Sequence, residues 1–124
     1  MSEFTKKNAS ELKDFLFHSN THDSQIQNIE YKYSKGVIKI ELYNSFYNSR
    51  YEFTFRDVVL FLTTKGDWGG RQDTVSALDL EEDYSYLQDK IPEHITCPED
   101  YLYLVLEAFS GDAIHILSKE VTVK

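Results

Sequence analysis

The chain has 124 residues, which is the length of one domain that can bury a core without disulfides or structural metals. Its formal net charge is −8, and this argues against a nucleic-acid partner, because such affinity comes largely from Lys and Arg that neutralise phosphates. The N-terminal residues lack the apolar core of a signal peptide, no apolar run could span a bilayer, and the single Cys97 cannot form an internal disulfide. We therefore expect a single domain over residues 1–124, in the cytoplasm and without membrane contact.

The first predicted element is a short amphipathic helix over residues 9–17. Asn8 suits the N-cap, and Glu11 follows at the spacing of a capping box. Apolar residues at helical spacing form one stripe, which consists of Leu12, Phe15 and Leu16. We expect this helix to end in the polar turn 18–21 and to cover an open face or edge of a sheet.

Three segments with period-two alternation follow, over residues 29–33, 38–42 and 51–55. Ser34-Lys35-Gly36 suits a hairpin turn, with Gly36 free to adopt positive φ. Alternating segments of this kind predict an antiparallel meander with one wet face. Lys39 and Glu41 are expected to point outward.

The second half of the chain continues the β pattern. Residues 57–62 fit either a strand or a short buried helical turn, because a short apolar run does not distinguish the two. The other expected segments are a loop over 65–74, a strand over 75–80, an irregular stretch over 81–100, a central strand buried on both faces over 101–109, a turn at 110–112 and a last strand over 113–123. In that last strand we expect His115 to point outward.

The sequence thus predicts an α+β fold that is mainly β: an antiparallel meander sheet, sandwich-like or strongly curled, with an N-terminal helix. The side chains expected in its core are Ile38, Ile40, Leu42, Phe53, Phe55, Leu104, Leu106, Ile114 and Ile116.

His22, Asp23 and Ser24 lie between the expected helix and the first strand. Asp and Ser often hydrogen-bond local backbone at such turns, so we interpret the three residues as a structural motif in which Asp23 contributes about 1 kcal/mol. The alternative is a small-ligand or metal-dependent enzyme that uses His18, His22 and Asp23, with His115 as a further group. Polar turn residues separate the two imidazoles, and the glutamate of the zinc-protease pattern is absent. We expect no catalytic residue, no metal site and no cofactor.

The acidic charge is concentrated between Asp79 and Asp100, where eight acidic residues accompany one basic residue. Such a segment keeps a protein soluble, and an acidic face also attracts a basic protein. Trp and Arg dominate interface hot spots, so Trp68 or Arg71 is expected near the rim of this face, unless Trp68 folds back over the core. The expected partner-binding residues are Trp68, Arg71, Glu81, Glu82, Asp83, Glu99 and Asp100.

One combination of short motifs spans most of the chain. It consists of a helix, His22-Asp23-Ser24-x-Ile26-x-x-Ile29, a β meander, Phe55-Arg56-Asp57-Val58, and a closing strand after Ser110-Gly111. In these residues the chain resembles a group of small uncharacterised bacterial proteins, some of which are encoded near polymorphic toxins and are regarded as immunity proteins. The resemblance implies binding of a cationic toxin and brings no catalytic residues.

Three hypotheses follow. The first is a non-enzymatic protein-binding domain, of the immunity type, with a basic protein as partner. The second is the enzyme described above, which requires His22 and Asp23 to converge with another ligand in an open cleft. The third is a self-associating structural domain, suggested by the Tyr-rich strands; the oligomeric state is left open by the sequence.

Overall fold

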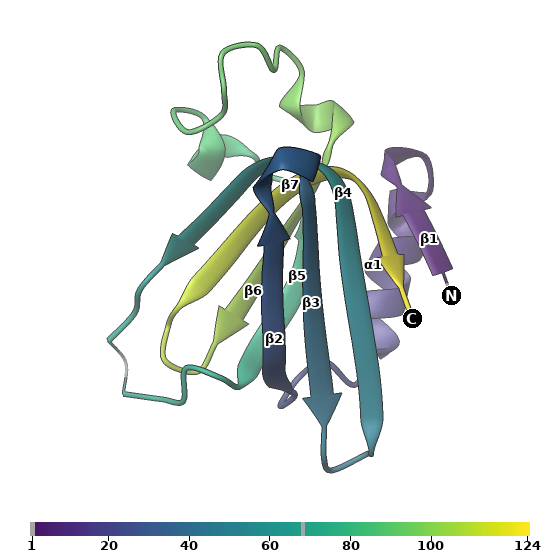
Figure 1. Ribbon diagram of the computed structural model, residues 1–124, viewed down its shortest axis with the longest axis vertical. Coiled ribbons are helices and arrows are strands. Elements are labelled where there is room, and N and C mark those ends of the chain that lie inside the picture. The colour runs from purple at the N-terminus through teal and green to yellow at the C-terminus, as the bar shows by residue number, and fades with distance from the viewer. Residues whose placement is uncertain (1, 68) are drawn as a thin grey trace.

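A computed structural model describes residues 2–67 and 69–124. It contains one antiparallel sheet of seven strands and one α-helix (Figure 1). The elements are β1 (Ser2–Thr5), α1 (Ala9–His18), β2 (Gln25–Lys32), β3 (Val37–Asn44), β4 (Ser49–Thr64), β5 (Val75–Glu81), β6 (Leu102–Ala108) and β7 (Ala113–Val123). The mainly β fold with an N-terminal helix is confirmed. No helix in the described residues is long and apolar enough to cross a membrane.

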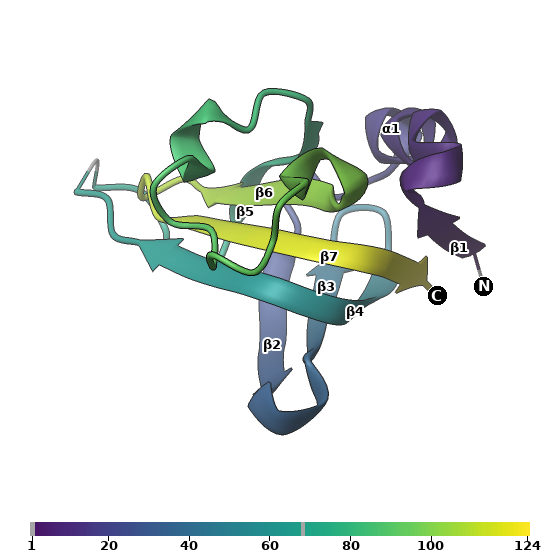
Figure 2. The same ribbon diagram turned by 90° about the horizontal axis from the view of Figure 1, so that it is seen from above.

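The strands lie in the order β2-β3-β4-β7-β6-β5, and β1 pairs with the end of β7. β4 pairs with β7 over most of its length but with β3 only over its first half. Between the two halves, Asp57 has a φ of 53° and a bulge lies between Val58 and Leu60. Bulges bend strands, and Figure 2 shows the β2–β3 hairpin standing at a steep angle to the layer of β4, β7 and β6. The sheet is therefore strongly curled.

The main core lies between the inner face of this sheet and α1. Leu12 and Leu16 of α1 pack into it, so the helix covers a sheet face as expected. All the side chains expected in the core are buried, except that Ile114 is only half-buried against it. Lys39 points outward, with its ammonium 3.7 Å from Glu52, and the register expected for β3 is correct.

A second, smaller core, which we call the outer core, lies on the outer face of β6 and β7. It contains Leu87, Tyr103, Val105 and Leu117, and residues 82–101 cover it. β6 is buried on both faces as expected, although it is next to the sheet edge rather than central. His115 points outward from the main core as expected, but the outer core covers this face of β7, so its side chain is only 8% exposed.

Other local differences have simple causes. Asn8 makes no capping hydrogen bond to α1; its Oδ1 accepts from Thr5 N at 2.7 Å, because a 3-10 turn (η1, Lys6–Asn8) precedes the helix. The strand β1, which the sequence pattern does not show, supplies Phe4 to the core. Tyr33 lies in a 3-10 turn (η2, Tyr33–Lys35) that ends at Gly36 with a φ of 63°, and it is exposed rather than part of a strand face. Residues 57–62 are strand.

Candidate functional site

The His22-Asp23-Ser24 corner joins three parts of the sheet. Backbone hydrogen bonds connect Asp23 N to Val75 O and Val75 N to Ser24 O, both at 2.8 Å, so the corner links the start of β2 to the start of β5. The Ser24 hydroxyl is fully buried and donates to Asn20 O at 2.8 Å. Ser24 therefore makes the local hydrogen bond that the sequence indicated, whereas the Asp23 carboxylate does not.

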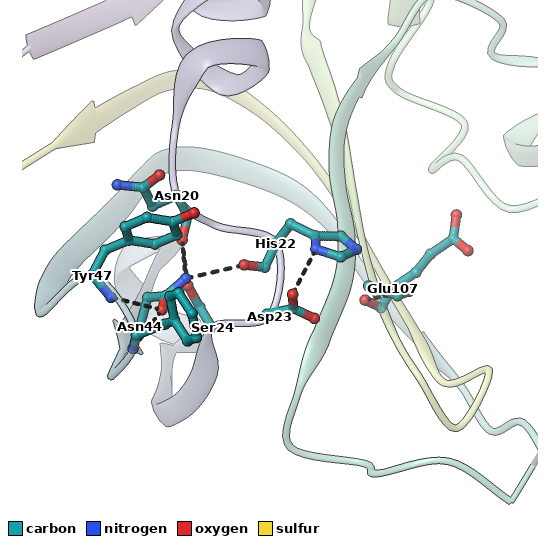
Figure 3. A network of polar contacts seen from close by, with 9 residues as sticks. Asn20, His22, Asp23, Ser24, Asn44, Tyr47 and Glu107 are labelled. Atoms are coloured by element: carbon teal, nitrogen blue, oxygen red, sulfur yellow. Dashed lines mark hydrogen bonds and ion pairs between the residues drawn. The ribbon is translucent and has the colours of Figure 1, made fainter.

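Asn44 completes this corner from the end of β3. Its side chain is 1% exposed, and its Nδ2 donates to Asn20 O and His22 O, each at 3.1 Å. Its Oδ1 accepts from the backbone N–H groups of Phe46 and Tyr47 (Figure 3). One buried amide thus ties the α1–β2 connection to the β3–β4 turn. The sequence gives little indication of this role, since Asn is common in turns and Asn44 lies between the segments 38–42 and 51–55 that are expected to be strands.

The side chains of His22 and Asp23 are exposed and contact each other. His22 Nδ1 lies 3.1 Å from Asp23 Oδ2, and each side chain is 64% exposed. The His22 ring also packs edge-on against Phe109 at 5.8 Å. The Ser24 hydroxyl is already bound to Asn20 O, so the three residues form no nucleophile–base–acid chain. The corner has the contacts of a structural junction.

His18 and His22 do not converge. His18 Nδ1 lies 3.5 Å from Asp14 on the same helix, while His22 pairs with Asp23. His115 lies in the outer core against Tyr103. Within residues 2–67 and 69–124, no three His, Cys, Asp or Glu side chains gather in a way that could hold a metal ion. The arrangement needed by the metal-dependent hypothesis is not present in that part of the chain.

Residues 82–101, which we call the acidic loop, contain a groove around which acidic residues gather. Figure 1 shows it as the green loop at the top of the molecule, at the opposite end from the β3–β4 turn. The groove measures about 520 Å³, and we call it the acidic groove. Its carboxylates are Glu82, Asp83, Glu93 and Glu99. Its apolar lining consists of Tyr84, Ile91, Pro92, Ile95 and Pro98.

The acidic loop has little regular structure, as expected, but it is firmly anchored. Leu87, in a 3-10 turn (η3, Ser85–Leu87), is fully buried in the outer core. Tyr84 packs on Tyr103 with ring centroids 5.5 Å apart and donates its hydroxyl to Tyr101 O at 2.6 Å. A second turn (η4, Pro98–Asp100) leads into β6. These contacts hold the walls of the acidic groove on the sheet.

Two groove carboxylates are already engaged within the chain. Lys13 of α1 lies 2.9 Å from Glu82 and lowers the pKa of that carboxyl group. The pKa of Asp83 is lowered because its carboxylate accepts a hydrogen bond from Ser85 N. By contrast, among the described residues no basic side chain lies within ion-pair distance of Glu93 or Glu99. These two have charge available for a partner.

The expected partner-binding residues do not all lie together. Glu82, Asp83 and Glu99 line the acidic groove, while Glu81 lines a neighbouring hollow between β5 and α1. Arg71 is far from them: its carbonyl accepts from Ser110 N beside the β6–β7 turn, at the other end of the molecule (Figure 1). Its guanidinium pairs with Asp73 at 3.2 Å. Arg71 therefore does not lie near the rim of the acidic face.

Trp68 lies outside the described residues. Asp100 is exposed beside Cys97 and lines a separate small hollow with it. Glu93 and the apolar groove residues were not singled out from the sequence; the two prolines among acidic residues were the only signal, since proline favours rigid, irregular backbone.

Comparisons with known proteins place the fold but no function. No family model matches the chain, and no curated protein matches it. Among solved structures, the crystal structure of an uncharacterized protein from Neisseria gonorrhoeae is similar, with a TM-score of 0.54 over 83% of this chain and 91% of that chain. The two sequences are 9% identical, so the similarity shows a shared fold only.

Proposed function

We propose that the protein is a non-enzymatic cytoplasmic domain that binds a cationic protein through the acidic groove. The observation that carries the proposal is a groove lined by apolar side chains together with four carboxylates, of which Glu93 and Glu99 have no ion-pair partner among the described residues. Lys and Arg side chains have apolar stems and charged heads, so they match such a groove in both respects. The resemblance to immunity proteins agrees with a cationic toxin as the partner.

The charge distribution also supports a binding role. Like charges gathered on one loop destabilise the folded chain by mutual repulsion, so their gathering favours a purpose other than folding. A focused negative potential raises the rate at which a basic partner arrives. The enzyme hypothesis has weaker support, because within the described residues no third metal-ligating side chain gathers with the exposed His22–Asp23 pair.

The first test uses a defined cationic probe, a capped Gly-Lys-Leu-Lys-Gly peptide, titrated into the labelled protein and followed by amide NMR shifts. We expect the shifts to concentrate at residues 82–99, and to weaken as the salt concentration rises, because screening acts beyond about 10 Å at 0.1 M. The same peptide with Glu in place of Lys is the control. Shifts scattered over the whole surface, or equal shifts with the Glu peptide, would contradict the proposal.

A second test uses charge-matched variants. Glu93→Lys with Glu99→Lys reverses the two unpaired groove carboxylates, while Glu30→Lys with Asp67→Lys makes the same change in net charge on exposed residues elsewhere. Loss of peptide binding is expected only in the first double variant. Equal loss in both would show that net charge, rather than the acidic groove, attracts the peptide.

A further inference from the structure

The acidic loop is held on the sheet by an aromatic contact that includes a buried histidine. Tyr86 of the loop stacks on His115 of β7, with ring centroids 4.7 Å apart and planes 19° apart. On the β6 side, the hydroxyl of Tyr103 lies 2.7 Å from His115 Nδ1. His115 is therefore enclosed between the sheet and the loop, and it forms part of the surface on which the loop sits.

The surroundings of His115 favour its neutral form. The titratable and charged groups that face it are Tyr103 and Glu107 on β6 and Tyr86 and Lys90 on the acidic loop. From β4, the residue opposite His115 is the uncharged Leu62. Burial lowers the pKa of His115, the Glu107 carboxylate raises it, and the Lys90 ammonium lowers it, so that the net effect is a lowered pKa.

Protonation of His115 would have three unfavourable effects on the docked loop. Neutral His115 can accept the hydroxyl hydrogen of Tyr103 at Nδ1, but a protonated Nδ1 is a donor, and Tyr103 then loses its acceptor. The new positive charge would also be repelled by the Lys90 ammonium, which lies 4.5 Å from the centroid of the Tyr86 ring that stacks on His115. The new charge would also be buried without a carboxylate in contact. Each change favours a lifted loop in which the imidazolium is hydrated.

We propose that His115 is a proton-sensitive latch: in its neutral form it keeps the acidic loop docked, and its protonation releases the loop. Tyr84 and Ile91 line the acidic groove and also pack in the outer core, so lifting the loop takes the groove apart. The effect of the latch on partner binding rests on the proposed function. The pH-dependent docking of the loop does not.

The direction with pH follows from the lowered pKa. In a lifted loop His115 is exposed and its pKa returns to about 6.5. The docked loop is fully favoured above that value, and the preference is lost as the pH falls below it, because only the lifted state then gains a proton. At about pH 5.0 the equilibrium constant for lifting rises by up to about 30-fold if His115 in the docked loop stays neutral.

Amide hydrogen exchange tests the latch at about pH 7.5 and about pH 5.0, a range in which ordinary carboxylates remain largely ionised. After correction for intrinsic exchange rates, protection of residues 84–91 should fall by on the order of 10-fold to 30-fold at the lower pH, while the β4–β7 ladder keeps its protection. His94→Gln is the matched control, because His94 is an exposed histidine of the same loop. It should behave as the wild type does.

His115→Gln should remove the pH dependence, since an amide oxygen can accept from Tyr103 but does not titrate. Retention of the wild-type dependence in this variant would overturn the latch. If the variant does not fold, imidazole NMR of the wild type decides: shifts of the loop should follow the titration of His115, and shifts that follow the exposed histidines instead would overturn it. Protection of residues 84–91 that is the same at the two pH values defeats the latch alone, whereas absence of peptide binding at both pH values defeats the proposed function.

Discussion

At the scale of single residues, Asn44 is the side chain of the His22-Asp23-Ser24 corner whose removal should lower the stability of the protein most. Asn44→Ala removes hydrogen bonds to Asn20 O, His22 O and two N–H groups of the next turn. Buried groups left without partners cost more than an ordinary hydrogen bond, so we expect the free energy of unfolding in urea to fall by about 2–4 kcal/mol. Ser45→Ala, at the exposed neighbouring position, should change it by less than about 0.5 kcal/mol.

A loss below about 1 kcal/mol in Asn44→Ala would show that water replaces the amide at this corner. It would also remove the reason for regarding the α1–β2 connection and the β3–β4 turn as one rigid unit.

Asp23 acts through its backbone conformation rather than through a hydrogen bond to the main chain. Its φ is 67°, in the left-handed region that Asp tolerates better than Ala. Asp23→Ala should therefore cost about 1 kcal/mol, and Asp23→Gly should be close to neutral, in parallel urea denaturations. Equal losses in the two variants would point instead to the carboxylate contact with His22.

At the scale of elements, α1 is attached to the sheet by one apolar stripe. Leu12 is fully buried whereas Phe17, on the same helix, is 84% exposed. Leu12→Ala should lower the free energy of unfolding by about 2–5 kcal/mol, and Phe17→Ala should leave it within about 0.5 kcal/mol. A large effect of Phe17→Ala in the isolated protein would mean that α1 uses its outer face in a contact between copies, as the self-association hypothesis requires; sedimentation would then show a dimer.

The strands show where local pattern succeeds and where it fails. Alternation placed β3 correctly because one of its faces is wet, so the two faces differ in residue type. In β7, His115 looked like an outward polar residue between Ile114 and Ile116. It does face outward from the main core, but the acidic loop returns to cover that face, and no periodicity within β7 indicates this.

At the scale of the whole molecule, the acidic charge should promote binding and at the same time lower the stability of the folded chain. Reversing Glu93 and Glu99 removes repulsion on the loop, so this double variant should unfold at a temperature equal to or higher than the wild type even though it no longer binds the cationic peptide. Adding salt should raise the melting temperature of the wild type more than that of the variant. A destabilised variant would indicate that these carboxylates contribute to folding, and the case for a binding role would lose its support.

The sequence by itself determined the class of the fold, the limits of most elements and most of the core. These follow from local rules: helical spacing in α1, period-two alternation in β3 and β4, and turn residues such as Gly36 at positive φ. It also located the acidic segment, since charge is a property of composition. Such features depend on neighbours along the chain, which a sequence displays directly.

Only the tertiary structure decided which of the candidate residues share a site. It separated Arg71 from the acidic loop, brought Glu93 and Glu99 to the same groove, and enclosed His115 beneath Tyr86. It also showed that Ser24 and Asn44, rather than Asp23, make the side-chain hydrogen bonds at the corner. These juxtapositions depend on the bend of β4 and on the return of an irregular loop over the sheet, and contacts between residues far apart in sequence leave no periodic signal in either segment.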